Sequence, residues 1–231
     1  MLIQHVPLLC TKRIVLASAS PRRSELLRGL GLKVEVLPST FEENLDKSGF
    51  ANPGEYATET AMHKAIDVSQ QAAKASFGRR ADLIIAADTV VELHSQVLEK
   101  PFDKDDAYRM LSSLSGQKHK VYTGVALVLP NASDSAPGAP PLVKSFYEET
   151  EVEFAELEEE AILAYIASGE PMDKAGAYGI QGIGGSFVKC IHGCYFNIMG
   201  FPVHRYVVCS HVLLHLYTNI AEADNYSVCP Y

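Results

Sequence analysis

The stretch Arg13-Ile14-Val15-Leu16-Ala17-Ser18-Ala19-Ser20-Pro21-Arg22-Arg23 joins four consecutive apolar residues to a serine, a proline and two arginines. The apolar run predicts a short buried strand. Serine is a favoured N-cap and proline is favoured at the first helical position, so the stretch also predicts a tight turn and a helix that begins near Ser20. Residues 33–37 alternate between polar and apolar and predict a second strand. The start of the chain is therefore predicted to fold as strand, helix, strand.

Predicted strands and helices alternate along the rest of the chain. The run Leu83-Ile84-Ile85-Ala86-Ala87 is continuous and apolar, as in a central strand buried on both faces, and this strand is expected to end at Asp88 and Thr89. Because several pairs of strands have no helix between them, we predict an α/β fold with a mixed sheet. Further strands are expected over residues 97–101, 121–129, 149–154 and 186–191, an exposed loop over 131–141, and helices over 52–76, 103–114 and 156–168 and from residue 203 onward.

The charge balance of the 231-residue chain is acidic, with 28 acidic and 20 basic residues and a formal charge of -8. A protein whose main task is to hold nucleic acid is expected to carry a basic surplus, so no nucleic-acid partner is predicted. Eight glutamates and no basic residue lie between Glu148 and Glu160. This cluster lacks the ligand spacing of a calcium loop, and it is predicted to form the solvated faces of a strand and a helix.

The cysteines and the apolar segments indicate a cytoplasmic protein. Five cysteines, at positions 10, 190, 194, 209 and 229, are an odd number in a chain of this length, and they are predicted to be reduced thiols. The N-terminal charges follow the apolar stretch, unlike those of a signal peptide, and no run reaches the roughly 18 apolar residues that span a bilayer. Cys190, His192 and Cys194 have the spacing of metal ligands, but a fourth ligand is missing, so zinc is not expected.

The turn at residues 18–23 is the strongest candidate for an anion site. A helix N-terminus offers free N–H groups and the positive end of a dipole. The hydroxyls of Ser18 and Ser20 add donors, and the guanidinium groups of Arg22 and Arg23 suit phosphate oxygens. These groups predict a polyphosphate site, without the glycine-rich Walker pattern. The same residues are as typical of a capped surface helix with solvated arginines, and the turn alone leaves both interpretations open.

Other polar residues stand beside predicted strands or turns. Asp88 follows the most apolar strand, where a carboxylate holds a divalent metal, activates water or does both, although a turn-forming aspartate is the more common reason for such a position. Lys100 follows another strand, and Glu43 and Lys64 are further candidates. Gln181 lies among the five glycines of residues 173–185, where its amide faces a base edge or, equally, holds the loop together.

Four segments in a fixed order resemble the Maf family of nucleotide pyrophosphatases. They are Ser18-Ala19-Ser20-Pro21-Arg22-Arg23, Ala87-Asp88-Thr89, Leu98-Glu99-Lys100-Pro101 and Asp173-Lys174-Ala175-Gly176-Ala177-Tyr178-Gly179-Ile180-Gln181-Gly182. Each segment alone is weak evidence, but the ordered set is specific. The resemblance implies an elongated, mixed and twisted sheet flanked by helices, as in the related inosine-triphosphate pyrophosphatases. It also implies a family domain over residues 12–216, with terminal extensions at 1–11 and 217–231.

The resemblance implies hydrolysis of a nucleoside triphosphate to the monophosphate and pyrophosphate, with Mg²⁺ or Mn²⁺ as cofactor. Asp88 matches the family's proton acceptor, and Glu43 and Asp88 are then the residues that anchor the metal. Arg22, Thr89 and Gln181 match the positions that set substrate choice, and this combination belongs to the branch that acts on dTTP and UTP. The positions expected to hold the phosphates are Ser18, Ser20, Arg22, Arg23, Lys64 and Lys100.

Two rival functions stay open beside this expectation. One is a nucleotide-binding regulator of cell division that does not turn over its ligand, although pure binding needs no base such as Asp88. The other is a pyrophosphatase for another modified nucleotide. The amino-acid sequence of several stretches is similar to the Maf half of a eukaryotic two-domain protein that also carries a methyltransferase-like domain. No membrane partner is expected, and a homodimer stays open.

Overall fold

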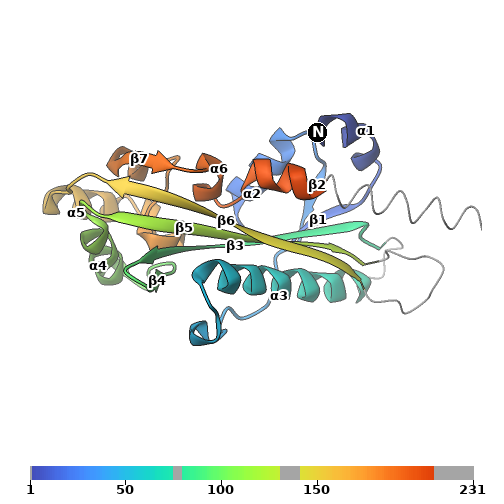
Figure 1. Cartoon of the computed structure of the whole chain (residues 1–231), viewed down its shortest axis with the longest axis horizontal. Coiled ribbons are helices and arrows are strands. Elements are labelled where there is room, and N and C mark those ends of the chain that lie inside the picture. Colours follow the sequence, from blue (N-terminus) through green and yellow to red (C-terminus); the bar gives the residue numbers. More distant parts are fainter. Residues whose placement is uncertain (1, 75–79, 131–140, 211–231) are drawn as a thin grey trace, which may run out of the picture.

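The computed structural model describes residues 2–74, 80–130 and 141–210, which form one mixed sheet of seven strands with helices on both faces (Figure 1). The strands are β1 (Ile14–Leu16), β2 (Val34–Val36), β3 (Leu83–Leu93), β4 (Gln96–Leu98), β5 (Lys118–Leu129), β6 (Leu142–Phe154) and β7 (Val188–His192). Their order is β2-β1-β3-β5-β6-β7, and β4 pairs with β3. β1 runs parallel to β2 and β3, and the other pairs are antiparallel. The predicted α/β class with a mixed sheet is confirmed.

The helices lie on both faces of the sheet and at its two ends. The long helix α3 (Pro53–Lys74) runs along one face, and α2 (Pro21–Gly29) and α6 (Tyr195–Ile198) lie on the other (Figure 1). The predicted helix from residue 203 is confirmed as far as residue 210. Three predicted parts lie outside the described residues: positions 75–76 of the helix 52–76, positions 131–140 of the loop, and the extension 217–231. The remaining helices are α1 (Val6–Leu9), α4 (Lys104–Leu114), α5 (Glu159–Ala167) and the 3₁₀ turns η1 (Leu2–His5), η2 (Lys47–Gly49), η3 (Glu170–Asp173), η4 (Ala175–Ala177) and η5 (Ile183–Phe187).

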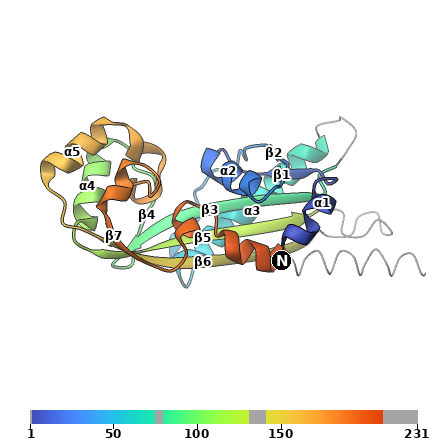
Figure 2. The same ribbon diagram turned by 90° about the horizontal axis from the view of Figure 1, so that it is seen from above.

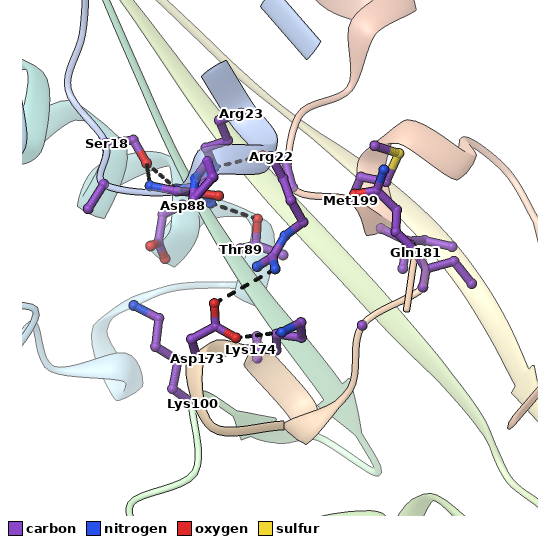
Figure 3. A pocket seen from close by; sticks show the side chains of 18 of the residues that line it. Ser18, Arg22, Arg23, Asp88, Thr89, Lys100, Asp173, Lys174, Gln181 and Met199 are labelled. Carbon is purple, nitrogen blue, oxygen red and sulfur yellow. Dashed lines mark hydrogen bonds and ion pairs between the residues drawn. The ribbon is translucent and has the colours of Figure 1, made fainter. Parts of the chain in front are cut away.

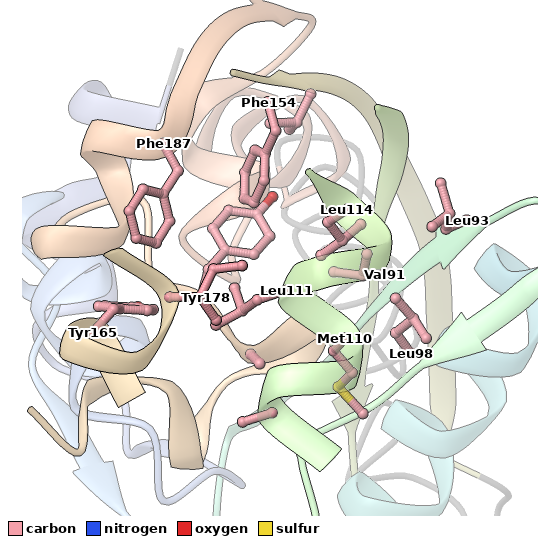
Figure 4. Close-up of a cluster of buried hydrophobic side chains, with 14 of the residues drawn as sticks. Val91, Leu93, Leu98, Met110, Leu111, Leu114, Phe154, Tyr165, Tyr178 and Phe187 are labelled. Carbon is pink, nitrogen blue, oxygen red and sulfur yellow. The ribbon is translucent and has the colours of Figure 1, made fainter. Parts of the chain in front are cut away.

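The molecule is elongated, with two lobes that share the long strands β3, β5 and β6 (Figure 2). One lobe holds α4, α5 and the turns η3 to η5, and its core is rich in aromatic rings (Figure 4). In that core the rings of Phe154 and Tyr178 lie 4.7 Å apart, and those of Tyr165 and Phe187 lie 5.0 Å apart. The other lobe packs β1, β2 and α2 over a core of aliphatic residues. The site described below lies between these two lobes.

Strand β3 is longer than its sequence predicted, and this corrects the position of Asp88. The strand was expected to end at Asp88 and Thr89, but it continues to Leu93. Asp88 lies opposite Gly124 and Thr89 opposite Thr123 on the neighbouring strand β5, so the two polar residues stay within the ladder. The segment after them is apolar and mostly buried, which favours its continuation as a strand. The carboxylate therefore projects from the middle of the sheet and not from the end of a strand.

The acidic cluster at residues 148–160 is paired on its strand face. The prediction of a solvated face is confirmed for this part, because the glutamates of β6 are partly exposed, and they form ion pairs with neighbouring strands and with the helical segment 203–210. These pairs are Lys118–Glu151 at 3.0 Å, Lys120–Glu149 at 2.9 Å, Lys189–Glu153 at 2.6 Å and Arg205–Glu148 at 3.3 Å. Their partial exposure limits the stability that each pair adds. The pairs of Lys118 and Lys120 accompany the early start of β5, whereas the early start of β6 follows from the pairing of residues 142–148 with residues 123–129 of β5.

Helix α3 approaches the sheet very closely at Gly124. A Cβ atom at this position would lie 2.2 Å from the backbone nitrogen of Thr58, a distance that real side chains do not show. Glycine therefore allows the helix backbone to lie directly on β5. This close packing also brings Lys64, two turns further along α3, next to Asp88 on β3.

Candidate active site

A pocket of about 720 Å³ lies between the two lobes, within the size range of small-molecule sites (Figure 3). Residues from the start of α2, from α3, from β3 and from the glycine-dense turns line it. All ten candidate residues predicted from the sequence are in this lining: Ser18, Ser20, Arg22, Arg23, Glu43, Lys64, Asp88, Thr89, Lys100 and Gln181. The structure thus brings together segments that are more than 150 residues apart in the chain.

The turn before α2 forms as predicted, with Ser20 at the N-cap and Pro21 at the first helical position. The Ser20 hydroxyl makes no capping hydrogen bond, so it is available to a ligand in the pocket. The backbone N–H of Ser20 donates to the Ser18 hydroxyl at 3.3 Å, which closes the turn. The start of a helix presents N–H groups and a partial positive charge to the pocket, and this arrangement favours an anion.

Arg23 is fixed by three hydrogen bonds. Its Nε donates to the backbone oxygen of Gly200 at 2.9 Å, and one terminal nitrogen donates to the hydroxyl of Ser18 at 2.9 Å. The other terminal nitrogen donates to the hydroxyl of Thr89 at 3.0 Å. Burial lowers the pKa of this guanidinium from its ordinary value, while the carboxylates of Asp88 and Glu43 act in the opposite direction. An arginine held in this way is oriented before any ligand binds.

The ammonium group of Lys64 lies between two carboxylates. Its Nζ is 2.7 Å from Oδ1 of Asp88 and 2.8 Å from Oε1 of Glu43. Burial raises the pKa of Asp88, and Lys64 and Arg23 oppose this shift. For Glu43 burial acts upward as well, but the positive charges of Lys64, Lys100 and Arg23 outweigh it, so its pKa is lowered. Two carboxylates therefore converge on one position that holds a cation.

The opposite wall of the pocket carries a second group of charges (Figure 3). A terminal nitrogen of Arg22 lies 3.8 Å from Oδ2 of Asp173, an ion pair without the geometry of a hydrogen bond. Lys174 holds the same carboxylate through Oδ1 at 2.5 Å and donates to the backbone oxygen of Glu170 at 2.6 Å. Lys100 lines the pocket with an exposed side chain. Arg22 is thus held less tightly than Arg23 and faces the open side of the site.

Glu170 organises the glycine-dense turns. Its carboxylate accepts hydrogen bonds from the hydroxyl of Tyr165 at 3.0 Å and from the backbone N–H groups of Ile183 at 2.9 Å and Gly184 at 3.2 Å. A Cβ at Gly182 would lie 2.3 Å from this carboxylate, so a larger residue there would displace the Glu170 side chain from these hydrogen bonds. The tight packing predicted for this segment is confirmed.

The Gln181 amide is not used to hold these turns together. Among the described parts of the chain, no group forms a hydrogen bond with it, and its side chain is exposed at the pocket. Figure 3 shows Gln181 beside Met199, on the side of the pocket away from Asp88. The alternative that Gln181 only braces the loop therefore has no supporting contact.

Several residues of the site were not found from the sequence. Glu170, Asp173 and Lys174 lie in or beside a segment that carries the family resemblance, and that position was the available signal. Thr123 and Asn197 are buried polar residues next to the pocket, but their neighbours in sequence do not set them apart from other polar residues. Apolar and aromatic residues complete the lining of the pocket: Val91, Val121, Tyr178, Ile198 and Met199.

The structure gives no support to a zinc site at Cys190 and Cys194. Within residues 2–74, 80–130 and 141–210, no group of three or more potential ligands is arranged to hold a metal without further help. Cys190 lies 3.5 Å from the ring nitrogen Nε2 of His192, and the four described cysteines are free thiols. In the same described ranges, no helix is long and apolar enough to cross a membrane.

Comparisons with known proteins find relatives over most of the chain. Residues 13–210 match the family model described as Maf-like protein. The chain is 52% identical over 195 residues to the human "Probable bifunctional dTTP/UTP pyrophosphatase/methyltransferase protein", a match that covers 84% of this chain and 31% of that protein. It is 46% identical over 194 residues to a Clostridium perfringens "dTTP/UTP pyrophosphatase", a match that covers 93% of that protein. It is 47% identical over 194 residues to a "dTTP/UTP pyrophosphatase" from Carboxydothermus hydrogenoformans, a match that covers 94% of that protein. Each of these two matches covers 84% of this chain.

Proposed function

The chain belongs to the Maf family, and from this premise we propose that it hydrolyses dTTP and UTP to the monophosphate and pyrophosphate. The single observation that carries the proposal is one pocket in which a buried carboxylate, Asp88, faces four cationic side chains. These are Arg22, Arg23, Lys64 and Lys100. Such a pocket suits a substrate with several negative charges and a reaction that needs a base.

The cationic side chains and the start of α2 suit the triphosphate. A nucleoside triphosphate carries about four negative charges, which must be neutralised before water attacks phosphorus. Arg23 is fixed, so it offers its remaining N–H groups to phosphate oxygens without reorganisation. Arg22, Lys100 and the hydroxyls of Ser18 and Ser20 stand around the same space. In this proposal these groups bind the triphosphate chain.

The residues present fit a divalent metal. Glu43 and Asp88 both reach the position of the Lys64 ammonium, so a cation at this point has two carboxylate ligands. Mg²⁺ is commonly bound by one or two carboxylates together with substrate phosphates, which matches a site without a third protein carboxylate. A metal bound here supplies positive charge and polarises the phosphate oxygens. We therefore propose Glu43 and Asp88 as the metal-anchoring residues.

Asp88 is the proposed general base. Burial raises its pKa, so its carboxylate binds a proton more readily than an ordinary aspartate does. It takes a proton from the water whose oxygen attacks the α-phosphorus. The bond from this phosphorus to the oxygen that bridges to the β-phosphorus breaks, and that oxygen leaves as part of pyrophosphate. Lys64, in contact with Asp88, holds this carboxylate in position until a metal takes the place of its ammonium.

Substrate choice is proposed to depend on Arg22, Thr89 and Gln181. The unpaired amide of Gln181 offers a donor and an acceptor, as does the edge that uracil and thymine share. A pocket that pairs with this edge rejects bases that leave its amide unpaired. The apolar residues beside Gln181, among them Met199, give the ring a surface to pack on.

Further parts of the proposal concern the whole protein. We propose a cytoplasmic location, which the free thiols of the described cysteines support, because such thiols are usual in a reducing compartment. The domain is proposed to span residues 12–216, and no nucleic-acid partner is expected. A homodimer is tested by sedimentation of the purified chain.

The test is an assay of pyrophosphate release from UTP, dTTP, CTP, GTP and modified triphosphates, with Mg²⁺ or Mn²⁺. We expect UTP and dTTP to be hydrolysed fastest, and Asp88→Asn to lower kcat by at least about a hundredfold with the fold intact. Binding of UTP without turnover by the wild type would support the rival function of a non-catalytic regulator. Near-normal turnover by a folded Asp88→Asn protein would contradict the role given to Asp88.

A further inference from the structure

A chain of hydrogen bonds leads from Arg23 away from the pocket into the sheet. A terminal nitrogen of Arg23 donates to Oγ1 of Thr89 at 3.0 Å. Oγ1 of Thr89 lies 2.9 Å from Oγ1 of Thr123 on the neighbouring strand. Oγ1 of Thr123 donates to the backbone oxygen of Asn197, in α6, at 2.9 Å. Four residues from three separate parts of the fold are thus connected.

The direction of every bond in this chain is determined. A carbonyl oxygen only accepts, so the hydroxyl proton of Thr123 is used in its bond to Asn197. Thr123 must therefore accept in its bond with Thr89, and the hydroxyl proton of Thr89 is used there. A guanidinium only donates, so Thr89 accepts from Arg23. All donors point from Arg23 towards the carbonyl of Asn197.

The first consequence concerns Thr89. Its only hydroxyl proton is donated to Thr123, so Thr89 has no donor left for a base or a phosphate. Its oxygen already accepts one bond from Arg23. The Thr89 hydroxyl is therefore fully used as a donor, and the bond that it accepts orients the Arg23 guanidinium.

The second consequence concerns Arg23. Of its five N–H groups, three are used, by Ser18, Thr89 and the backbone of Gly200. Each terminal nitrogen keeps one further N–H, which can donate to a phosphate oxygen. Their direction depends on all three anchors, and one anchor depends on Thr123.

The far end of the chain is firmly held. Asn197 and Thr123 are fully buried. The Asn197 amide donates to the backbone oxygen of Val121 and to the hydroxyl of Thr150, both at 3.0 Å. The segment that supplies the carbonyl for Thr123 is also the segment that carries Gly200, the acceptor for Arg23 Nε. Two of the three anchors of Arg23 thus end on residues 197–200.

We propose that Thr123 is a positioning residue, and that Thr89 and Thr123 together orient Arg23 for the phosphate chain of the substrate. This deepens the proposed function and rests on it for the identity of the substrate. Thr89 contributes to substrate choice by placing the triphosphate relative to the base pocket, not by contact with the base. Asn197 contributes through its backbone oxygen, so its side chain acts only by holding the segment.

The test compares Thr123→Val, Thr123→Ser and Thr150→Val. Valine removes the hydroxyl with little change of shape, and serine keeps it. Thr150 is an equally buried threonine whose hydroxyl holds the backbone of Cys194 and the Asn197 amide, so Thr150→Val loosens the segment 197–200 without removing a hydrogen bond of the chain between Thr123 and Arg23. The first measurement is calorimetric binding of inorganic tripolyphosphate, which has no base, to the full chain at constant Mg²⁺. The second is kcat and KM for UTP.

We expect Thr123→Val to weaken tripolyphosphate binding about tenfold, which corresponds to about 1.4 kcal/mol, and to raise KM for UTP by a similar factor. Thr123→Ser should restore both values to within about twofold of the wild type. Thr150→Val should change both values less than Thr123→Val at comparable loss of Tm. Equal effects of Thr123→Val and Thr150→Val, or no rescue by serine, would overturn the proposal.

Thr89→Val separates the two roles of that residue. If it acts through Arg23, Thr89→Val weakens tripolyphosphate as much as UTP, and the double variant with Thr123→Val is no worse than Thr89→Val alone. A change in the ratio of UTP to GTP with unchanged tripolyphosphate binding would refute the indirect role. A wild type that binds tripolyphosphate but does not hydrolyse UTP or dTTP would contradict the proposed function and leave the role of Thr123 measurable.

Discussion

Replacing Lys64 with methionine is expected to lower the thermal stability of the protein, and a divalent metal is expected to restore part of the loss. The methionine keeps the length of the side chain but removes the ammonium that touches Asp88 at 2.7 Å and Glu43 at 2.8 Å. The side chains of Lys64 and Asp88 are each 10% exposed, so Asp88 is left as a buried carboxylate without its nearest counter-charge. Glu43 is 40% exposed and is expected to lose little, since water screens it.

The size of the effect follows from this burial. Removing one partner of a buried ion pair costs about 3–5 kcal/mol, and we take about 3 kcal/mol because Asp88 can bind a proton instead. In a domain of this length each kcal/mol shifts Tm by about 2–4 °C, so Tm should fall by about 6–12 °C in the presence of EDTA. With Mn²⁺ the metal takes the place of the ammonium between the two carboxylates, and the fall should be less than half as large.

Scanning calorimetry of the wild type and of Lys64→Met, each with EDTA and with Mn²⁺, measures both values. Lys47→Met is the matched control, because Lys47 forms an exposed ion pair with Glu99 at 3.1 Å and its loss should cost less than about 1 kcal/mol. An equal fall of Tm with and without metal would refute the idea that metal and ammonium share one position. A fall no larger than that of Lys47→Met would refute the energy assigned to the buried pair.

Three further predictions concern other parts of the molecule. Gln181→Glu removes a donor and adds negative charge, so kcat/KM for UTP and dTTP should fall relative to GTP by about 1–3 kcal/mol; an unchanged ratio would rule out contact with the base. Burial lowers the pKa of His119 to about 4, so the ring is neutral in the folded protein while the unfolded chain binds a proton below about pH 6.5. The contribution of His119 to the free energy of unfolding is therefore fully present above pH 6.5 and is lost as the pH falls towards 4. Over this range the wild type should lose about 3 kcal/mol more than His119→Gln. Urea unfolding at pH 7 and 4.5 measures this loss, and equal pH dependence in both proteins would contradict the prediction. Gly124→Ala places a Cβ 2.2 Å from the backbone of Thr58, so it should lower the free energy of unfolding by about 1–3 kcal/mol. It should also lower kcat, because α3 carries Lys64. Gly49→Ala has nothing within 4 Å of its Cβ and should change neither value; similar results for the two variants would show that α3 adjusts freely.

Much of the fold was predictable because its signals are local. The serine and proline before α2 determine where that helix begins, and the apolar run from Leu83 predicts a buried strand whatever the rest of the chain does. The length of that strand was not predictable, because Asp88 and Thr89 are retained in it by pairing with Gly124 and Thr123 on another strand. The early starts of β5 and β6 likewise depend on pairing between the two strands, which the sequence of one strand does not show.

Most of the candidate residues that line the pocket were predicted from four ordered segments, but their arrangement in the pocket was not. The sequence named Lys64, Glu43 and Asp88 separately, and only the packing of α3 on β5 shows that one ammonium lies between both carboxylates. Thr123 has no sequence signal, since its role comes from a backbone oxygen in α6 that lies 74 residues away in the chain. Positions that act through hydrogen bonds to the backbone are poorly visible in sequence, because the acceptor does not depend on the side chain.

The strands that pass through the pocket have a mechanical consequence. β3, β5 and β6 continue from one lobe into the other, so the lobes are not joined by a loop at which a few dihedral angles absorb a rotation. Hydrogen-bonded ladders resist a local break, and a change in the distance between the lobes must be shared as slight bending and twisting along each strand. Changes in the width of the pocket are therefore expected to be small, and the force that opposes each change grows with the displacement.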